Sequence, residues 1–268
     1  MNSPSNIGIL FLNFGEPSTY THHEVVGFLE RIFDRNSSLE SKGAEARART
    51  KELARRRAPH LIEEYEAMGG SPLNLQASQQ AKRVEKELRR RNVNARCYSG
   101  TQFTDPFIGA AVEQAKNDKV EQVIALPIYP LCGKSTTIAA LEDVRDAMDH
   151  CGLDVPLREI TGWHRHPDYF SMRADNIVNY TLSENVDLHS DDTALVFSAH
   201  GTPIKYLENG PRYSQYVEET CVGVAKQLGV STYSLGYQNH TNRNIEWTSP
   251  AIDEVVRNTK QSNVVLEA

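Results

Sequence analysis

The chain has 268 residues, which is enough for one large domain or for two domains that each have a hydrophobic core. Hydrophobic residues make up 39% of the sequence and charged residues 24%, and the formal net charge is −6. These values are typical of a globular protein and argue against nucleic acid as the main partner, because there is no basic excess to neutralise phosphates.

The order of polar and apolar residues also bears on location. The first six residues do not form a secretory signal, and no apolar run approaches the roughly 20 residues that span a membrane. We therefore expect a cytoplasmic protein, for which weak association with a membrane surface stays open. The cysteines Cys97, Cys132, Cys151 and Cys221 form no CxxC pair, which predicts reduced thiols rather than a disulfide framework or a zinc ribbon.

Buried strands alternate with amphipathic helices along the first part of the chain. Residues 7–14 are a continuous apolar run that ends at Gly15, a pattern typical of a strand buried on both faces, and residues 122–127 repeat it. Shorter strands are expected at residues 95–100 and 155–161. The predicted helices cover residues 23–33, 45–68, 75–91, 106–116 and 136–150.

The alternation continues in the second part of the chain. Strands are predicted at residues 193–199, 233–238 and 263–266, and helices at 168–183, 211–228 and 251–258. Alternating strands and helices imply parallel sheets covered by helices. The sequence therefore predicts an α/β fold of two Rossmann-like domains, residues 1–165 and 166–268. Because the last predicted strand ends the chain without a covering helix, we expect the C-terminal part of the second domain to be missing.

Polar residues follow several of the predicted strands, and ligands bind beyond the carboxyl ends of strands in open α/β sheets. His200 follows a buried strand and precedes Gly201, so the backbone can turn sharply there and expose the imidazole. A neutral imidazole binds a borderline metal such as Fe²⁺ or accepts a proton near neutral pH. From the residues alone, two interpretations of His200 have equal weight: a chemical role of this kind, and a histidine that only packs against the strand end.

Other candidates have competing interpretations. The run Arg55–Arg57 is either a solvated helix face or a cluster that holds carboxylates by charge-assisted bonds. Trp247 either packs against a helix start or lines a flat apolar ligand. His240 is either a second polar group of the site or structural, and His164 is expected to be structural. No G-x-G-x-x-G follows a strand, so a dinucleotide is not indicated.

Five local strings together resemble one family. IGILFLNFGEP, YEAMGGSPLN, ALPIYP, VFSAHGTP with the following ENGPRYSQYVEET, and the region of Trp247 are similar to ferrochelatases, in that family's order and at about its spacing. The resemblance implies two Rossmann-like domains of the class II chelatase type with a porphyrin cleft between them. It implies a lyase of heme biosynthesis that inserts Fe²⁺ into protoporphyrin IX or coproporphyrin III.

The same resemblance implies roles for three residues that would face the macrocycle. His200 resembles the family histidine that binds the metal or accepts the pyrrole protons, and one imidazole can do both in turn. Phe14 stands where the family has Met or Tyr, and because a phenyl ring cannot ligate iron it is expected only to pack. Trp247 resembles the tryptophan that lines the porphyrin face.

Contacts with the porphyrin carboxylates are implied as well. Arg56 and Arg57 match basic residues that pair with propionates. Tyr65 and Ser71 match residues of the cleft, with Ser71 donating a hydrogen bond to a propionate. The substrates implied are a porphyrin and ferrous iron, and no cofactor beyond the Fe²⁺ substrate is expected.

The sequence also departs from the family pattern. Gln102 and Phe103 stand where the family usually has an Arg-Tyr or similar pair. Residues 129–137 read YPLCGKSTT, where the family usually has Tyr-Pro-Gln-Tyr or Tyr-Pro-Gln-Phe with a serine-rich continuation. An acidic active-site residue expected after the last strand has no match, and Glu267 lies on the strand itself. The cysteine-rich tail that holds an iron–sulfur cluster in some members has no match either, so no cluster is expected.

Two alternatives follow from these observations. One is a catalytically impaired porphyrin- or heme-binding protein that lacks the C-terminal carboxylate, since general acid–base groups contribute roughly 100- to 10,000-fold to rates. The other is a cobalt or sirohydrochlorin chelatase of the same architecture. The GGSP string and Trp247 argue against that second alternative.

Overall fold

The computed structural model describes residues 6–37, 44–208, 212–239 and 245–267. The chain divides into two compact units. Unit 1 comprises residues 1–129 and 135–160, and unit 2 comprises residues 130–134 and 161–268. Each unit contains one parallel sheet flanked by helices, which confirms the predicted α/β class.

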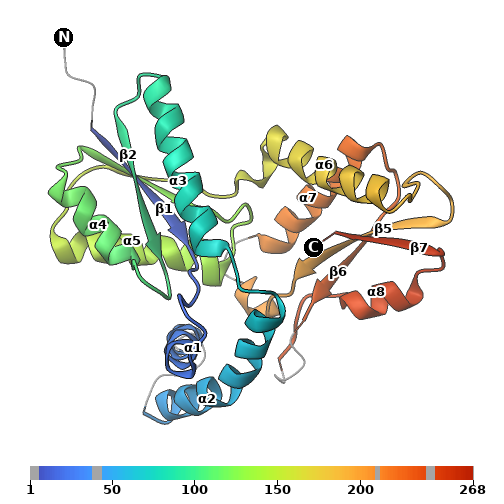
Figure 1. Cartoon of the computed structure of the whole chain (residues 1–268), viewed down its shortest axis with the longest axis horizontal. Helices are drawn as coiled ribbons and strands as arrows, with labels where there is room; N and C mark the ends of the chain where they lie inside the picture. Colours follow the sequence, from blue (N-terminus) through green and yellow to red (C-terminus); the bar gives the residue numbers. More distant parts are fainter. Residues whose placement is uncertain (1–5, 38–43, 209–211, 240–244, 268) are drawn as a thin grey trace. The chain divides into compact units, whose positions relative to one another are not determined.

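Unit 1 is built around β1, which is hydrogen-bonded to β2 on one side and to β3 on the other, in the parallel order β2-β1-β3-β4. Helices lie on both faces of this sheet (Figure 1), which explains why residues 7–12 of β1 show no alternation of polar and apolar residues. The elements are β1 (Ile7–Asn13), α1 (His22–Ser37), α2 (Ala44–Ala67), α3 (Leu73–Arg90), β2 (Ala95–Thr101), α4 (Ile108–Asn117), β3 (Gln122–Pro127), α5 (Ala139–Cys151) and β4 (Leu157–Glu159).

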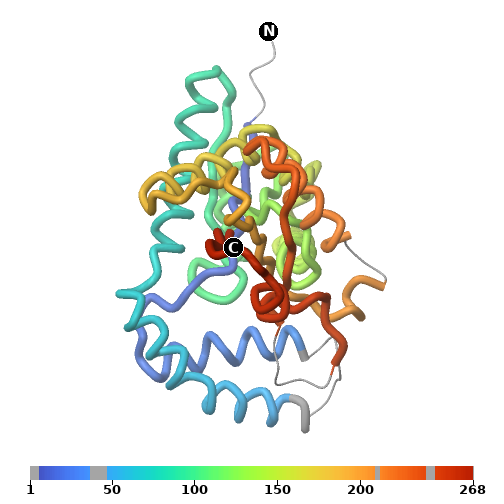
Figure 2. The backbone as a smooth tube through the Cα atoms, turned by 90° about the vertical axis from the view of Figure 1, so that its right-hand side faces the viewer, coloured from blue at the N-terminus to red at the C-terminus, as the bar shows by residue number. Residues whose placement is uncertain are grey.

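The helices of unit 1 form two groups. Helix α3 lies on one face of the sheet, whereas α4 and α5 lie on the other (Figure 1). Helices α1 and α2 follow β1 and run side by side beyond its carboxyl end (Figure 2). Their facing apolar residues and Phe103 make a cluster separate from the core of the sheet: Val25, Phe28, Leu29, Ala54 and Ala58.

Unit 2 has the parallel sheet order β6-β5-β7, with β5 in the centre. Helices α6 and α7 cover one face and α8 lies on the other (Figure 1). The elements are a 3₁₀ turn at Trp163–Arg165, α6 (Pro167–Ser183), β5 (Thr193–His200), a 3₁₀ turn at Ile204–Tyr206, α7 (Tyr213–Leu228), β6 (Ser234–Gln238), α8 (Ile252–Asn258) and β7 (Asn263–Glu267).

The units divide at residue 161, five residues before the expected boundary, and residues 130–134 join unit 2. Leu131 packs against the core of unit 2, and the Pro130 carbonyl accepts a hydrogen bond from the backbone N–H of His164 at 3.2 Å. The Lys134 ammonium also lies 5.4 Å from the centre of the Tyr206 ring. These contacts tie the segment to unit 2 although unit 1 surrounds it in sequence.

Two predicted elements differ from the structure. The helix expected from residue 136 begins as a π-helical turn, Lys134–Ile138, before α5 starts at Ala139. The β-branched run of Thr136, Thr137 and Ile138 has a low α-helical propensity, which is consistent with this start. The strand expected at residues 155–161 is only Leu157–Glu159, because Pro156 has no N–H to donate to the sheet.

A buried histidine joins the start of unit 2 to α7. The His164 side chain is completely buried, and its Nε2 lies 2.8 Å from a Glu219 carboxylate oxygen. Arg165 donates to both oxygens of the same carboxylate at 2.7 and 2.8 Å, and Gln215 donates to one of them at 2.9 Å. Hydrogen bonds from Arg165 and His164 lower the pKa of Glu219 from 4.5 to about 2.

Glu219→Gln should therefore destabilise the protein at neutral pH, by roughly 1–3 kcal/mol, because the charged acceptor is lost. Since the folded-state pKa of Glu219 is lowered, its contribution is complete above pH 4.5 and is lost as the pH falls toward 2. In denaturant unfolding between pH 3 and 7, the free energy of unfolding should fall less on acidification for this variant than for the wild type. Glu218→Gln, an exposed neighbour on α7, is the control, and an equally small fall there would contradict the assignment.

None of the described helices combines the length and apolar character needed to cross a bilayer.

Candidate functional site

His200 is the last residue of β5, the central strand of unit 2. The strand is buried from Leu195 to Ser198, and exposure rises through Ala199 to His200, whose side chain is exposed. His200 pairs in register with Gln238, the last residue of β6. The histidine therefore stands at the carboxyl edge of the sheet, where open parallel sheets bind their ligands.

A hydrogen bond of the imidazole indicates which of its nitrogens carries the proton. Nδ1 of His200 lies 2.7 Å from the carbonyl oxygen of Gly201. A carbonyl only accepts, so Nδ1 is the donor, and in the neutral ring the lone pair resides on Nε2. Nε2 is thus the nitrogen with the chemistry to bind a metal ion or to accept a proton.

The residue after this histidine must be glycine. A Cβ atom at Gly201 would overlap Oδ1 of Asn239 and would lie 2.7 Å from the carbonyl oxygen of Gln238. The Gly201 N–H donates to that same carbonyl at 2.9 Å. The backbone that follows β5 therefore passes so close to the end of β6 that position 201 has no room for a side chain.

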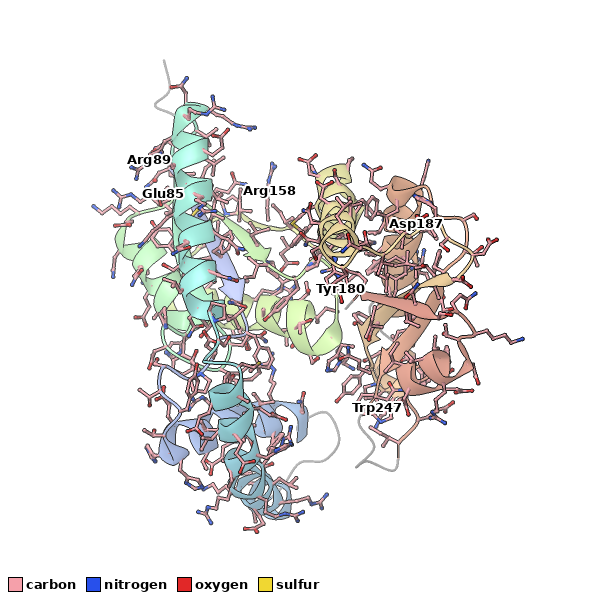
Figure 3. The ribbon with its side chains drawn as sticks, turned by 45° about the vertical axis from the view of Figure 1, so that its right-hand side comes forward. Glu85, Arg89, Arg158, Tyr180, Asp187 and Trp247 are labelled. Atoms are coloured by element: carbon pink, nitrogen blue, oxygen red, sulfur yellow. The ribbon has the colours of Figure 1, made fainter. Side chains whose placement is uncertain are left out.

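Backbone pairing brings Trp247 close to residues 201–203, which follow β5. Pro203 and Trp247 form an antiparallel bridge, and the backbone N–H of Thr248, a buried residue, donates to the Thr202 carbonyl at 3.0 Å. The Thr248 hydroxyl also accepts from the Thr202 N–H at 3.1 Å. Trp247 is half-buried in the segment that leads into α8 (Figure 3). The structure thus brings two predicted site residues, His200 and Trp247, to one end of unit 2.

Phe14 follows β1 in unit 1 and contacts other aromatic rings. Its ring lies 4.6 Å from that of Phe103 and 6.1 Å, edge to face, from that of Phe28. The backbone N–H of Phe14 donates to Oδ1 of Asn13 at 2.7 Å. Phe14 therefore packs between the strand ends and the α1–α2 cluster, a contact that a ring without donor atoms is suited to make.

Tyr65 and Ser71 lie together around the end of α2. The Tyr65 ring stacks on Tyr20 at 4.5 Å, and the Tyr20 hydroxyl accepts a hydrogen bond from the Ser71 N–H at 2.9 Å. Gly69 and Gly70 between them have positive φ angles, which glycine adopts without strain. Burial, with the nearby Glu16 carboxylate, raises the pKa of Tyr65 to about 12, so its phenol stays protonated at neutral pH.

The arginines of α2 are exposed. Arg55, Arg56 and Arg57 all face solvent, and Nη2 of Arg57 lies 3.2 Å from a carboxylate oxygen of Glu64. That ion pair is half-exposed, so it stabilises the fold little and leaves the Arg57 charge accessible to an anion.

Several residues around these sites were not predicted. Tyr20 lies far from Tyr65 in sequence, and no local pattern links them. Tyr213, whose hydroxyl donates to the His200 carbonyl at 3.0 Å, stands in the string ENGPRYSQYVEET, where the family resemblance had already drawn attention. His240 lies outside the described residues.

Among the described residues, no three His, Cys, Asp or Glu side chains cluster in a way that could hold a metal ion. All four cysteines are described and are thiols, as predicted. Glu267 lies on β7, as expected, and its carboxylate lies 2.5 Å from the guanidinium of Arg173 on α6.

Comparison with known proteins places the chain in a family. The family model for ferrochelatases matches residues 6–266. Ferrochelatase-1, chloroplastic/mitochondrial, of Arabidopsis thaliana is 32% identical over 96% of this chain and 56% of its own length. The ferrochelatases of Synechococcus sp. (strain RCC307) and Desulfotalea psychrophila are 31% and 29% identical, with 97% and 96% of this chain and 67% and 78% of their own lengths covered.

The chain thus spans a little over half of the length of the Arabidopsis relative and about two thirds of the length of the Synechococcus relative. The matched range covers both units, including the buried strand before His200 and the segment around Trp247. On the family match and these similarities, the chain belongs to the ferrochelatase family.

Proposed function

We propose that this protein inserts Fe²⁺ into a porphyrin, either protoporphyrin IX or coproporphyrin III, as a step of heme biosynthesis. The observation that carries the proposal is His200, which stands exposed at the carboxyl end of β5 with Nδ1 donating to Gly201. This arrangement presents an Nε2 lone pair in a protein that belongs to the ferrochelatase family. Ferrochelatases named as such in plants and bacteria support the same activity.

The proposed reaction exchanges two protons for one metal ion. Two pyrrole N–H protons leave the porphyrin as its four nitrogens bind Fe²⁺, and the metal keeps its oxidation state. Nε2 of His200 either binds the entering Fe²⁺ or accepts a pyrrole proton, since a neutral imidazole does both near neutral pH. Trp247, linked to the same turn, supplies a flat apolar surface for the macrocycle.

Residues of α2 and of the segment after it carry the proposed contacts with the porphyrin substituents. Arg56 and Arg57 are exposed cations that pair with propionates, and Ser71 is held by the Tyr20 hydroxyl just beyond the end of α2. Tyr65 acts as a neutral phenol, because its pKa lies near 12. Phe14 contributes apolar packing, since its ring offers no ligand for iron.

The purified chain should convert a free porphyrin to the metalloporphyrin when Fe²⁺ is added without oxygen, or when Zn²⁺ is added as a stable substitute. Absorbance and fluorescence of the porphyrin report the conversion. Comparing protoporphyrin IX with coproporphyrin III identifies the preferred substrate. Tight porphyrin binding without turnover would refute the proposed enzymatic activity and would instead indicate a porphyrin-binding protein.

Arg57→Ala should weaken porphyrin binding more than it slows the chemistry. We expect KM for the porphyrin to rise roughly two- to fivefold with kcat within twofold, the range expected for one exposed ion pair. Arg55→Ala, an exposed neighbour on α2, is the matched control. A porphyrin without carboxylates should show no difference between Arg57→Ala and the wild type, and an equal loss with that substrate would rule out the ion pair.

A further inference from the structure

The peptide group that joins His200 to Gly201 is held at both of its polar ends. Its N–H, which belongs to Gly201, donates to the carbonyl of Gln238 at 2.9 Å. Its carbonyl, which belongs to His200, accepts from the hydroxyl of Tyr213 at 3.0 Å. The two partners come from different elements, since Gln238 ends β6 and Tyr213 begins α7. The plane of this peptide is therefore set by two elements at once.

The orientation of the His200 imidazole depends on that peptide. Its Nδ1–H donates to the Gly201 carbonyl, one peptide further along the chain, at 2.7 Å. A rotation of the His200–Gly201 peptide would move this acceptor and loosen the bond that keeps the proton on Nδ1. Once that bond loosens, the two neutral tautomers become closer in energy, and Nε2 carries the lone pair for a smaller fraction of the time.

The β6 side of the turn is supported by further contacts. Nδ2 of Asn239 donates to the carbonyl of Thr248 at 2.7 Å, and Thr248 in turn bonds to Thr202 through its backbone N–H and its hydroxyl. On the α7 side, the Tyr213 hydroxyl donates to the peptide carbonyl. Because the contacts from β6 do not involve Tyr213, we expect them to stay in place when this hydroxyl is removed.

Tyr213 is well suited to this role. Its ring is half-buried and packs against the core of unit 2, together with Val217 and Cys221 of the same helix. That packing holds the hydroxyl in place, because α7 is anchored by its buried face. The ordinary pKa of a tyrosine hydroxyl, about 10, keeps such a group protonated and able to donate at neutral pH.

We propose that Tyr213 is a positioning residue that holds the His200–Gly201 peptide and, through it, the orientation and the Nδ1-protonated form of the His200 imidazole. The structural part of this proposal stands on the hydrogen bonds of unit 2 alone. Its kinetic consequence rests on the proposed function, because it assumes that His200 handles the metal or the pyrrole protons.

Tyr213→Phe is the test, since it removes the donor and keeps the ring that packs in the core. Tyr216→Phe is the matched control, because it makes the same change three residues later, where the ring contacts His164 and Arg165 instead. Nitrogen NMR of protein labelled in its histidine rings, at one fixed pH, reports which ring nitrogen is protonated. The His200 signals are those that disappear in His200→Ala.

In the wild type and in Tyr216→Phe, His200 should be protonated at Nδ1. In Tyr213→Phe, it should become a mixture of tautomers. Under the proposed function, kcat for metalation should fall about two- to tenfold in Tyr213→Phe, which is the range one neutral hydrogen bond supplies, while KM for the porphyrin stays within twofold. Melting temperatures define the range in which both variants are folded, and spectra are compared within it.

An unchanged His200 tautomer in Tyr213→Phe would overturn the proposal, as would the same change in Tyr216→Phe. A rise in the porphyrin KM with the tautomer unaltered would also overturn it. If the wild type binds porphyrin without metalating it, the proposed function fails, and the NMR comparison still decides the role of Tyr213.

Discussion

His200→Ala is expected to abolish metalation while leaving porphyrin affinity within a few-fold of the wild type. Under the proposed function, the substitution removes the nitrogen that would bind the metal or accept the pyrrole proton, and a positioned acid–base group contributes roughly 100- to 10,000-fold to a rate. Porphyrin affinity should change little, because Trp247 and the exposed arginines of α2 remain. Initial rates with Zn²⁺ or Fe²⁺, together with porphyrin titrations by fluorescence quenching, measure the two quantities separately.

His189→Ala is the matched control for this variant. His189 is also exposed and also lies in unit 2, but it precedes the amino end of β5, whereas His200 lies at the carboxyl end. Its removal should leave turnover within twofold. Turnover by His200→Ala at the wild-type rate would contradict the role proposed for His200. A loss of porphyrin affinity together with the loss of turnover would indicate a structural role instead.

Gly201→Ala should cause the second large effect, on stability and activity together. The added methyl group would meet the Gln238 carbonyl at 2.7 Å, and that carbonyl belongs to the backbone of β6, so it cannot rotate away. Overpacking of this kind typically costs about 1–3 kcal/mol. The shift needed to relieve it would also move the carbonyl that accepts from His200, so we expect metalation to fall at least tenfold, since misplacing a reacting group by about 1 Å costs roughly 100-fold.

Gly109→Ala provides the comparison, because Gly109 lies in α4 and a methyl group added there would meet no atom of another described segment within 4 Å. Alanine in a helix is favoured over glycine by about 0.5–1 kcal/mol, so this variant should be as stable as the wild type or slightly more stable. Urea unfolding of both variants measures the difference. Equal stabilities for Gly201→Ala and Gly109→Ala would show that the β5–β6 contact is not tight.

Much of the fold could be predicted from the sequence because burial has a strong local signature. Strands β1 and β5 are central in sheets that carry helices on both faces (Figure 1), so the middle of each strand is apolar without alternation. The predicted strand at residues 155–161 is longer than the edge strand β4 of the structure. Strand β4 is hydrogen-bonded to β3 alone, and the proline before it cannot donate to the sheet. The division of the chain into two units was less accessible, because residues 130–134 join unit 2 through contacts distant in sequence.

For the candidate site, the sequence by itself determined which residues could carry the chemistry. A histidine after a buried strand and before glycine, together with the strings shared with ferrochelatases, was sufficient to single out His200 and Trp247. Only the tertiary structure decided how they are held. The protonated nitrogen of His200 depends on the backbone geometry at Gly201, whereas the contact from Tyr213 and the stacking of Tyr20 on Tyr65 join residues of different elements. Hydrogen bonds and ring contacts of this kind depend on distances in space, and sequence order does not encode those distances when the partners lie on different elements.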